Sequence, residues 1–448
     1  MAGYPRPEPR GPSGTRDRPA EGESHAPDDE TAELSLIHLT VDDLRCIEHA
    51  ELHLHPGHNL IWGGNGSGKT SLLESIFLLG RGRSFRTRNS ERLIRHGRDR
   101  LVVFGRTGSA SPSGFMESSG PGGLATPGVT QDGTTPPDLP RGATSRYGST
   151  EAAWKGSVSL SSAATAIQVP ARTLDQALGV QVSRTDGTTA RISGTTARSL
   201  TELTQAFPVQ IIDPGVHKLV EEGAHRRRRW MDWAVFHVEH QFGDWWLRYT
   251  RILKQRNAAL RTQPAQVTAW DTELARVGEL IAESRRRFVE SLLPFWRESV
   301  LALSGLEPEL HYFKGWAQDV SLAEALAASK ARDESKRLTH PGPHRADVII
   351  RISGRPAREV LSRGQQKLVA VAMTLAQLNL LQQATETTPT LLLDDPAAEL
   401  DGEHLRRFIE QVMRLRSQLV LTSLHAESRL FGTPNRVFHV EQGRVQPV

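Results

Sequence analysis

Two short motifs that lie far apart in the chain constrain its fold more than any other feature. The first, Gly63-Gly64-Asn65-Gly66-Ser67-Gly68-Lys69-Thr70, has the G-x-x-x-x-G-K-[ST] spacing of a phosphate-binding loop. The second, Leu391-Leu392-Leu393-Asp394-Asp395, is an apolar run that ends in two carboxylates. The motifs lie near opposite ends of the chain, yet motifs of these two kinds serve the same phosphates. The fold must therefore bring two distant segments to one nucleotide site.

The first motif has the sequence context that a phosphate loop requires. Asn59–Trp62 predicts an apolar strand before the loop, and apolar residues at helical spacing after it predict a helix whose N-terminus points at the phosphates. We expect ATP and Mg²⁺ as ligands, with Lys69 on the β- and γ-phosphates and Thr70 on the metal ion. The residues expected to contact nucleotide are Gly63, Gly64, Asn65, Gly66, Ser67, Gly68, Lys69, Thr70 and Ser71.

The second motif and a third one complete the expected chemistry. Asp394 lies where Mg²⁺ is held, and Asp395 lies where a carboxylate can polarise the attacking water. The third motif, Leu361–Gln366, puts Ser362, Gly364 and Gln365 at the start of a predicted helix, which makes an anion site. In ATPases that carry such a second site, it serves the nucleotide of the other subunit. The combination predicts a two-fold dimer joined by ATP.

Composition and hydrophobic periodicity divide the chain into a split α/β nucleotide-binding domain and an inserted helical lobe. Proline, glycine and charge at the start predict a disordered tail, and a stretch rich in Gly, Ser, Thr and Pro predicts an expanded loop. The predicted parts are the tail 1–33, the first part of the ATPase domain 34–106, the insertion 107–162, a return to that domain 163–215, the helical lobe 216–346, and the last part of the ATPase domain 347–448. A strand at Leu419–Thr422 is predicted to be the last.

Overall composition excludes several classes of protein. The formal net charge is only +4, from 55 Lys and Arg against 51 Asp and Glu, so total charge does not indicate nucleic-acid binding. A single cysteine, Cys46, excludes an internal disulfide and a multi-cysteine zinc site, and we expect it to be buried. The chain has neither an apolar run long enough to span a bilayer nor a signal-peptide pattern, so we expect a cytoplasmic protein with no membrane partner.

Several further segments make residues 34–106 and 208–448 resemble the RecF family of bacterial recombination mediators, which are ABC-type ATPases related to Rad50 and SMC proteins. The segments that carry the resemblance are Gly63–Thr70, Gly80–Arg86, Glu221–Gly223, Arg226–Trp233, Phe236–Glu239, Lys254–Asn257, Gly342–Arg345, Leu361–Lys367 and Leu392–Asp401. The chain departs from the family pattern in its long N-terminal tail, in the 107–162 expansion, and in Cys46, where an asparagine is usual.

The resemblance implies an ABC-type ATPase head, with lobe I around the phosphate loop, a helical lobe II and no long coiled coil. It implies an ATP-dependent homodimer on double-stranded and gapped DNA that helps RecR/RecO-type mediator proteins to load a recombinase. It also implies weak, DNA-stimulated ATP hydrolysis that acts as a switch. An ATPase subunit of a transporter or of a nuclease-linked system remains an alternative.

The resemblance also assigns roles to single residues. Ser362 corresponds to the signature serine, Asp394 to the metal aspartate, Asp395 to the hydrolytic carboxylate and Asp401 to the subunit-contact aspartate. A histidine that senses the γ-phosphate usually follows the last core strand. Ser423 occupies that position and His425 follows two residues later, so the choice between them stays open.

Arginines in the helical lobe are the candidates for DNA contact. Four consecutive arginines, Arg226–Arg229, are spread about 100° apart around a helix, so some of them must be solvated or paired. Arg248, Arg251 and Lys254 recur at three-residue spacing and predict a basic helix face, with Arg256, Arg261 and Arg285–Arg287 as further candidates. We expect salt-dependent phosphate binding with little base reading. Four tryptophans of this lobe are expected in its core rather than as base-stacking platforms: Trp230, Trp233, Trp245 and Trp246.

Overall fold

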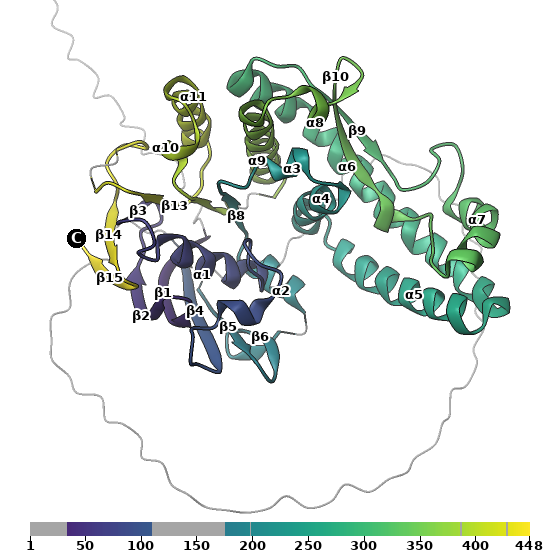
Figure 1. Ribbon diagram of the computed structural model, residues 1–448, viewed down its shortest axis with the longest axis horizontal. Coiled ribbons are helices and arrows are strands. Elements are labelled where there is room, and N and C mark those ends of the chain that lie inside the picture. Colours follow the sequence, from purple (N-terminus) through teal and green to yellow (C-terminus); the bar gives the residue numbers. More distant parts are fainter. Residues whose placement is uncertain (1–33, 110–174, 198, 386–387, 427–428) are drawn as a thin grey trace, which may run out of the picture.

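The computed structural model describes residues 34–109, 175–197, 199–385, 388–426 and 429–448. The predicted tail 1–33, nearly all of the predicted insertion 107–162, and residues 163–174 of the predicted return to the ATPase domain lie outside the described residues. Within those ranges, every helix is too short or too polar to span a bilayer. The helices of residues 224–336 lie to one side of the strands that residues 34–62 form (Figure 1).

An antiparallel sheet follows from an alternation of apolar and polar residues that a bulge interrupts between Leu36 and His38. Its strand order is β2-β1-β4-β5-β6-β7, with bounds β1 Leu34–Leu44, β2 Ile47–His53, β4 Arg100–Ser109, β5 Gln176–Ser183, β6 Gly187–Ile192 and β7 Thr195–Thr196. Leu39, Val41 and Leu52 are buried on one face, because successive side chains point to opposite faces of a strand. β4 and β5 pair directly, with Phe104 opposite Gly179. The long expansion therefore connects two neighbouring strands of one sheet.

A second, mainly parallel sheet carries the motifs. Its strand order is β15-β14-β3-β13-β12-β8, with bounds β3 His58–Trp62, β8 Val209–Ile212, β12 Thr390–Leu393, β13 Leu419–Ser423, β14 Arg436–Glu441 and β15 Arg444–Pro447. Leu391 and Leu393 belong to one hydrophobic cluster and Leu392 to the other, so both faces are covered. β13 is not the last strand, contrary to the prediction. The β14–β15 hairpin is half-exposed at the sheet edge, which weakens its apolar pattern.

Helices form most of the rest of the described chain. Their bounds are α1 Lys69–Arg81, α2 Leu200–Ala206, α3 Lys218–Glu221, α4 Ala224–Val238, α5 Phe242–Thr262, α6 Asp271–Ser304, α7 Leu322–Lys336, α8 Ala357–Val360, α9 Arg363–Thr385, α10 Pro396–Glu399 and α11 Gly402–Met413, with 3-10 turns η1 Ser90–Leu93, η2 Pro264–Trp270 and η3 Pro343–Arg345. The sequence predicts one helix through Trp230–Leu260, but the chain turns at 239–241. That turn lets the rings of Phe236 and Phe242 pack edge to face, with their centroids 5.0 Å apart.

The helical lobe includes a small sheet and a hydrophobic core. The sheet has the order β11-β10-β9, formed by β9 Glu309–Phe313, β10 Asp347–Ile352 and β11 Arg355–Pro356. Trp230 and Trp233 are buried, and Trp245 and Trp246 pack against the same cluster, which confirms the predicted core role of all four. α9 packs along α6, and β10 pairs with β9. We therefore propose that the helical lobe extends past the predicted boundary at residue 346 to the end of α9.

Cys46 is exposed, so the expectation that it is buried was wrong. The residue lies in the turn between β1 and β2, directly after Arg45, whose backbone has the left-handed φ of +53°. Such a turn between two strands lies at the surface of the protein. The turn also contacts the phosphate loop, because a Cβ placed on Gly68 would lie 3.2 Å from the Cys46 thiol.

A partly buried histidine, His344, lies in the η3 turn and has a hydrogen-bond partner at each ring nitrogen. His344 Nδ1 accepts a hydrogen bond from the Tyr249 hydroxyl at 2.7 Å, and Nε2 donates to Thr339 O at 3.2 Å. Burial lowers the pKa of His344 to about 4, so the folded protein keeps this imidazole neutral while the unfolded chain protonates it below about pH 6.5. This contribution to stability is complete above that pH and is lost as the pH falls towards 4.

We expect the free energy of unfolding to fall by on the order of 3 kcal/mol from this group between about pH 6.5 and pH 4. In His344→Gln, which can still accept the Tyr249 hydrogen bond, that component of the pH dependence should be absent in urea unfolding curves. His311→Gln is the matched control, because His311 is exposed. A pH profile of His344→Gln that parallels the wild type would contradict the assignment.

Candidate nucleotide-binding site

Three neighbouring parallel strands bring the two distant motifs to one edge of a sheet. β3 pairs with β13, and β13 pairs with β12, all in parallel. The phosphate loop follows β3 and Asp394 follows β12, so both emerge at the carboxyl ends of the strands, where α/β sheets bind ligands. The Gly63 N–H donates to the Ser423 carbonyl at 3.3 Å and ties the start of the loop to β13.

The loop itself needs its glycines for close packing and for backbone shape. Gly66 and Gly68 have φ of +76° and +122°, which side chains other than glycine rarely adopt. A Cβ on Gly63 would lie 2.2 Å from the Val440 carbonyl oxygen. The Gly443 N–H donates to the Ser67 carbonyl at 2.8 Å. The β14–β15 hairpin, which the sequence did not predict, therefore packs against the loop and supports it.

Lys69 and Ser67 present polar groups that fit phosphate oxygens. Lys69 Nζ donates to the loop's own carbonyls, Gly63 O at 2.7 Å and Gly64 O at 2.9 Å. Burial lowers the pKa of Lys69, and the nearby carboxylates Asp395 and Asp394 partly oppose that shift. The Ser67 hydroxyl is buried without a hydrogen-bond partner among the described residues. A phosphate oxygen would supply the partner that the Ser67 hydroxyl lacks, and it can replace a loop carbonyl as an acceptor for Lys69.

Asp394 is the centre of a hydrogen-bonded group of oxygen atoms. Thr70 Oγ1 lies 3.0 and 3.1 Å from the two Asp394 carboxylate oxygens. Thr422 Oγ1 donates to Asp394 Oδ1 at 2.9 Å and accepts from the Asp395 N–H at 2.9 Å. A hydroxyl and a carboxylate side by side are the hard oxygen donors that Mg²⁺ prefers. Asp395 follows with the left-handed φ of +48°, which directs the chain into α10.

Thr422 and Asp213 lie near this centre and were not predicted from the sequence. Thr422 forms hydrogen bonds with both Asp394 and Asp395. The sequence feature that could have identified Thr422 is a small polar residue at the end of a buried strand. Asp213 follows β8, the neighbour of β12, and lines a cavity together with Asp394 and Lys367. Burial raises the pKa of Asp213 and Asp394 adds to that shift, whereas Arg226 lowers the pKa. Its position after a predicted strand could have identified it.

The residues predicted to contact the partner's nucleotide, Ser362, Gly364, Gln365 and Asp401, lie outside the hydrogen-bonded group around the phosphate loop. Ser362, Gly364 and Gln365 are exposed at the start of α9, where Ser362 and Gln365 bond to each other: Ser362 N donates to Gln365 Oε1 at 3.0 Å and Gln365 N to Ser362 Oγ at 3.3 Å. Asp401 is exposed and caps α11 through the His404 N–H at 3.1 Å.

Gly64, Asn65 and Gly66 are exposed in the loop, and Ser71 is buried in the first turn of α1. Ser423 is buried at the end of β13, and its hydroxyl accepts the His425 N–H at 3.1 Å while His425 itself is exposed. The hydrogen bond ties His425 to the strand that lies next to the loop.

The family model and the similar proteins that match this chain agree with one another, and they cover most of its length. The family described as RecF/RecN/SMC N terminal domain matches residues 35–108 and 146–446. The DNA replication and repair protein RecF of Shewanella sp. strain MR-4 is 32% identical over 418 residues, which cover 92% of this chain and 99% of that protein. RecF of Pseudomonas putida strain F1 is 34% identical over 420 residues, covering 92% and 98% of the two chains.

Solved structures agree on the fold. The structure of the recombination mediator protein RecF with ATP, from the RecFOR pathway, superposes with a TM-score of 0.73 at 22% sequence identity, covering 95% of this chain and all of that chain. This likeness confirms the predicted class, an α/β ATPase head with a helical lobe; no long coiled coil occurs in the described part of the chain.

Gly63→Ala should disturb the loop, since the new methyl group would overlap the Val440 carbonyl and the chain or the β14–β15 hairpin would have to shift. Overpacking of this kind costs about 1–3 kcal/mol, so we expect a fall of several degrees in the melting temperature and weaker binding of a fluorescent ATP analogue. Gly64→Ala is the matched control for stability, because a Cβ there meets nothing within 4 Å. Equal melting temperatures for the two variants would refute the packing argument.

Proposed function

Because this chain belongs to the RecF family of DNA replication and repair proteins, which contains the RecF/RecN/SMC N-terminal domain, we propose that it is an ATPase whose ATP-bound form dimerises on DNA. In this proposal the dimer assembles at gaps or at junctions between single- and double-stranded DNA. It helps mediator proteins of the RecR/RecO type to load a recombinase, and slow hydrolysis of ATP releases it. The relatives' names favour this role over the transporter and nuclease-linked alternatives.

The dimer proposal rests on one observation: the residues predicted to bind nucleotide form two separate groups. Lys69, Thr70 and Asp394 lie together at the sheet edge, whereas Ser362 and Asp401 are exposed and have local hydrogen bonds. Ser362 is exposed beside the N-terminus of the 23-residue helix α9, whose partial positive charge attracts an anion. The second group can then bind the nucleotide held by a partner, and two copies complete two sites by symmetry.

In the proposed hydrolysis, each residue of the first group has its own role. Thr70 and Asp394 would hold Mg²⁺, which supplies charge neutralisation for the phosphates when bound. Lys69 exchanges its carbonyl partners for phosphate oxygens. Thr422 fixes the Asp395 backbone through a 2.9 Å hydrogen bond. In this proposal the Asp395 carboxylate, which interacts electrostatically with Lys69, orients and deprotonates the attacking water. The bond from the γ-phosphorus to the bridging oxygen breaks as the water oxygen adds, and ADP and phosphate leave.

The ion pairs of the helical lobe narrow the candidate DNA contacts. Several predicted arginines are occupied within the fold: Arg227 by Asp347, Arg228 by Ala346 O, Arg248 by Glu273, Arg256 by Asp271 and Asp333, Arg285 by Asp232, Arg286 by Glu283 and Glu290, and Arg287 by Glu239. The run Arg226–Arg229 therefore does not form one basic surface. We propose that Arg251, Lys254 and Arg261 contact DNA, since all three are exposed on one face of α5.

A second group of positive charge lies where α1 ends and α4 begins. Burial and the neighbouring Arg83, Arg226 and Arg88 lower the pKa of Arg229 to about 10, and its Nε has no hydrogen-bond partner among the described atoms. Arg226 is paired with Glu222 at 2.8 Å. Positive groups that repel one another and remain incompletely paired attract phosphate. We propose that this group extends the DNA contact from α5 towards the ATPase lobe.

Asp395→Asn should keep ATP binding and lose hydrolysis, because the amide cannot accept the proton of the attacking water. We expect wild-type protein to elute as a dimer with ATP and as a monomer with ADP in size-exclusion chromatography with light scattering, each run with and without gapped DNA. The Asp395→Asn dimer should persist at least tenfold longer after free ATP is removed. Wild-type hydrolysis rates in Asp395→Asn would remove its catalytic role.

Ser362→Ala tests the composite site in the same experiment. It should weaken ATP-dependent dimerisation while the monomer still binds ATP, because Ser362 belongs to the group proposed to serve the partner's nucleotide. Lys69→Ala is the contrasting variant, in which nucleotide binding itself should be lost. A Ser362→Ala variant that dimerises with wild-type affinity would argue against a shared nucleotide.

Replacing Arg251, Lys254 and Arg261 together by alanine should weaken binding to duplex and gapped DNA, measured by fluorescence anisotropy as a function of salt. The slope of log K against log salt should fall by about 0.9 for each phosphate that the variant no longer neutralises. The control replaces Arg276, Arg286 and Arg287 by alanine, which removes the same charge from exposed residues already held in ion pairs. If both triple variants lose affinity equally, net charge and not the α5 face determines binding.

A further inference from the structure

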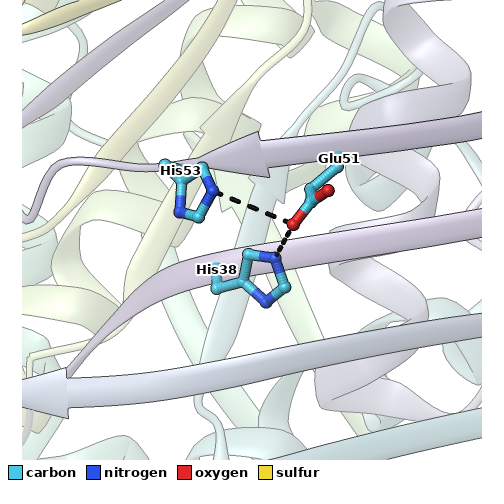
Figure 2. Close-up of side chains that lie close together, drawn as sticks. All are labelled: His38, Glu51 and His53. Carbon is cyan, nitrogen blue, oxygen red and sulfur yellow. Dashed lines mark hydrogen bonds and ion pairs between the residues drawn. The ribbon is translucent and has the colours of Figure 1, made fainter. Parts of the chain in front are cut away.

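Three metal-ligating side chains gather on the exposed face of the antiparallel sheet, away from the phosphate loop. His38 comes from β1, and Glu51 and His53 come from β2 (Figure 2). His38 Nε2 lies 2.8 Å from Glu51 Oε1, and His53 Nε2 lies 3.8 Å from the same oxygen. One ligand atom from each residue lies within 4.8 Å of the other two.

The sheet holds these three positions in a fixed relation. His38 and His53 are directly paired across β1 and β2, and Glu51 lies two residues before His53 on the same face. The neighbours on the opposite face, Leu39 and Leu52, are fully buried, so a slip in register would expose the core. The two imidazole rings lie 4.9 Å apart, and the ring of Phe104 meets His38 edge-on at 6.2 Å.

We propose that His38, Glu51 and His53 form a surface site for a borderline divalent cation, with Zn²⁺ as the preferred ion. Two imidazoles and one carboxylate are a ligand set that Zn²⁺ uses when a fourth position stays open. Bonds of about 2.0–2.2 Å to tetrahedral Zn²⁺ put ligand atoms about 3.3 Å apart. The separations of Glu51 Oε1 from the two imidazole nitrogens, 2.8 Å and 3.8 Å, bracket that value. Small shifts of the three side chains would therefore admit the ion.

The surrounding charges are compatible with a cation. Arg106 is the cross-strand neighbour of His38 on β4, but its guanidinium lies 3.2 Å from the Asp175 carboxylate, which offsets its charge. A bound ion would join the edge strand β2 to β1 by a link additional to their backbone hydrogen bonds. A ligand that binds only the folded state raises its stability, so the site should act as a metal-dependent staple of this hairpin.

The test uses untagged full-length protein without nucleotide, titrated with Co²⁺ and followed by visible absorption, then displaced by Zn²⁺. We expect a tetrahedral Co²⁺ spectrum in the wild type, and a rise in melting temperature with Zn²⁺. His53→Ala should lower the affinity at least tenfold and abolish the temperature shift. Glu51→Gln should do the same, and it keeps the hydrogen bond to His38 within reach, so loss of binding cannot be attributed to a collapsed strand pair.

His49→Ala is the matched control. His49 lies on β2 on the same face, and it pairs with Asp42 of β1 at 2.7 Å, but that pair contains only one histidine. Its replacement should leave Co²⁺ affinity unchanged. The proposal is overturned if wild type shows no tetrahedral Co²⁺ spectrum, or if His53→Ala and Glu51→Gln bind Co²⁺ as the wild type and His49→Ala do, since binding then occurs elsewhere, such as at Thr70 and Asp394.

Discussion

Without the parallel pairing of β3, β13 and β12, the two halves of the nucleotide site would not meet. Ladder hydrogen bonds between these short, buried strands bring residues 63–70 to the same edge as Asp394 and Asp395. Thr422, on the middle strand, then bridges the two carboxylate positions through its hydroxyl. Because both faces of the sheet are buried, the carboxyl edge is where polar side chains can reach solvent and nucleotide.

Several arginines of the helical lobe form buried ion pairs within it. Arg285 is fully buried against Asp232, and Arg256 is fully buried against Asp333, with further hydrogen bonds to Pro343 O and Thr339. Breaking such a pair leaves an uncompensated buried charge, which costs about 3–5 kcal/mol. Much of the lobe's positive charge is therefore neutralised inside it. The exposed positive charge of the α5 face differs from these buried, paired arginines in being open to solvent.

The nucleotide site and the proposed dimer follow from how α1 and α9 are placed. α1 begins at the carboxyl edge of the sheet, and Lys69 and Ser71 in its first turn are buried. α9 instead begins at the surface and packs along α6, so the exposed Ser362 is carried by the helical lobe. A partner that binds at Ser362 would act on that lobe through a continuous helix. In the proposed function, this is how ATP at one subunit's loop is coupled to the lobe that contacts DNA.

The meeting of the loop and Asp394 at one edge of a sheet could be predicted from the amino-acid sequence, because the glycine spacing, the lysine and a carboxylate after an apolar strand are typical of the two halves of one nucleotide site. The α/β class and most strands could be predicted too, since alternation and helical periodicity are local properties. Three-dimensional packing was needed to learn which arginines are paired, that Thr422 and Asp213 lie beside Asp394, and that β14 and β15 support the loop. Each of these depends on contacts between segments far apart in the chain, such as Arg227 with Asp347 or Ser67 with Gly443. Local sequence patterns carry no record of such partners.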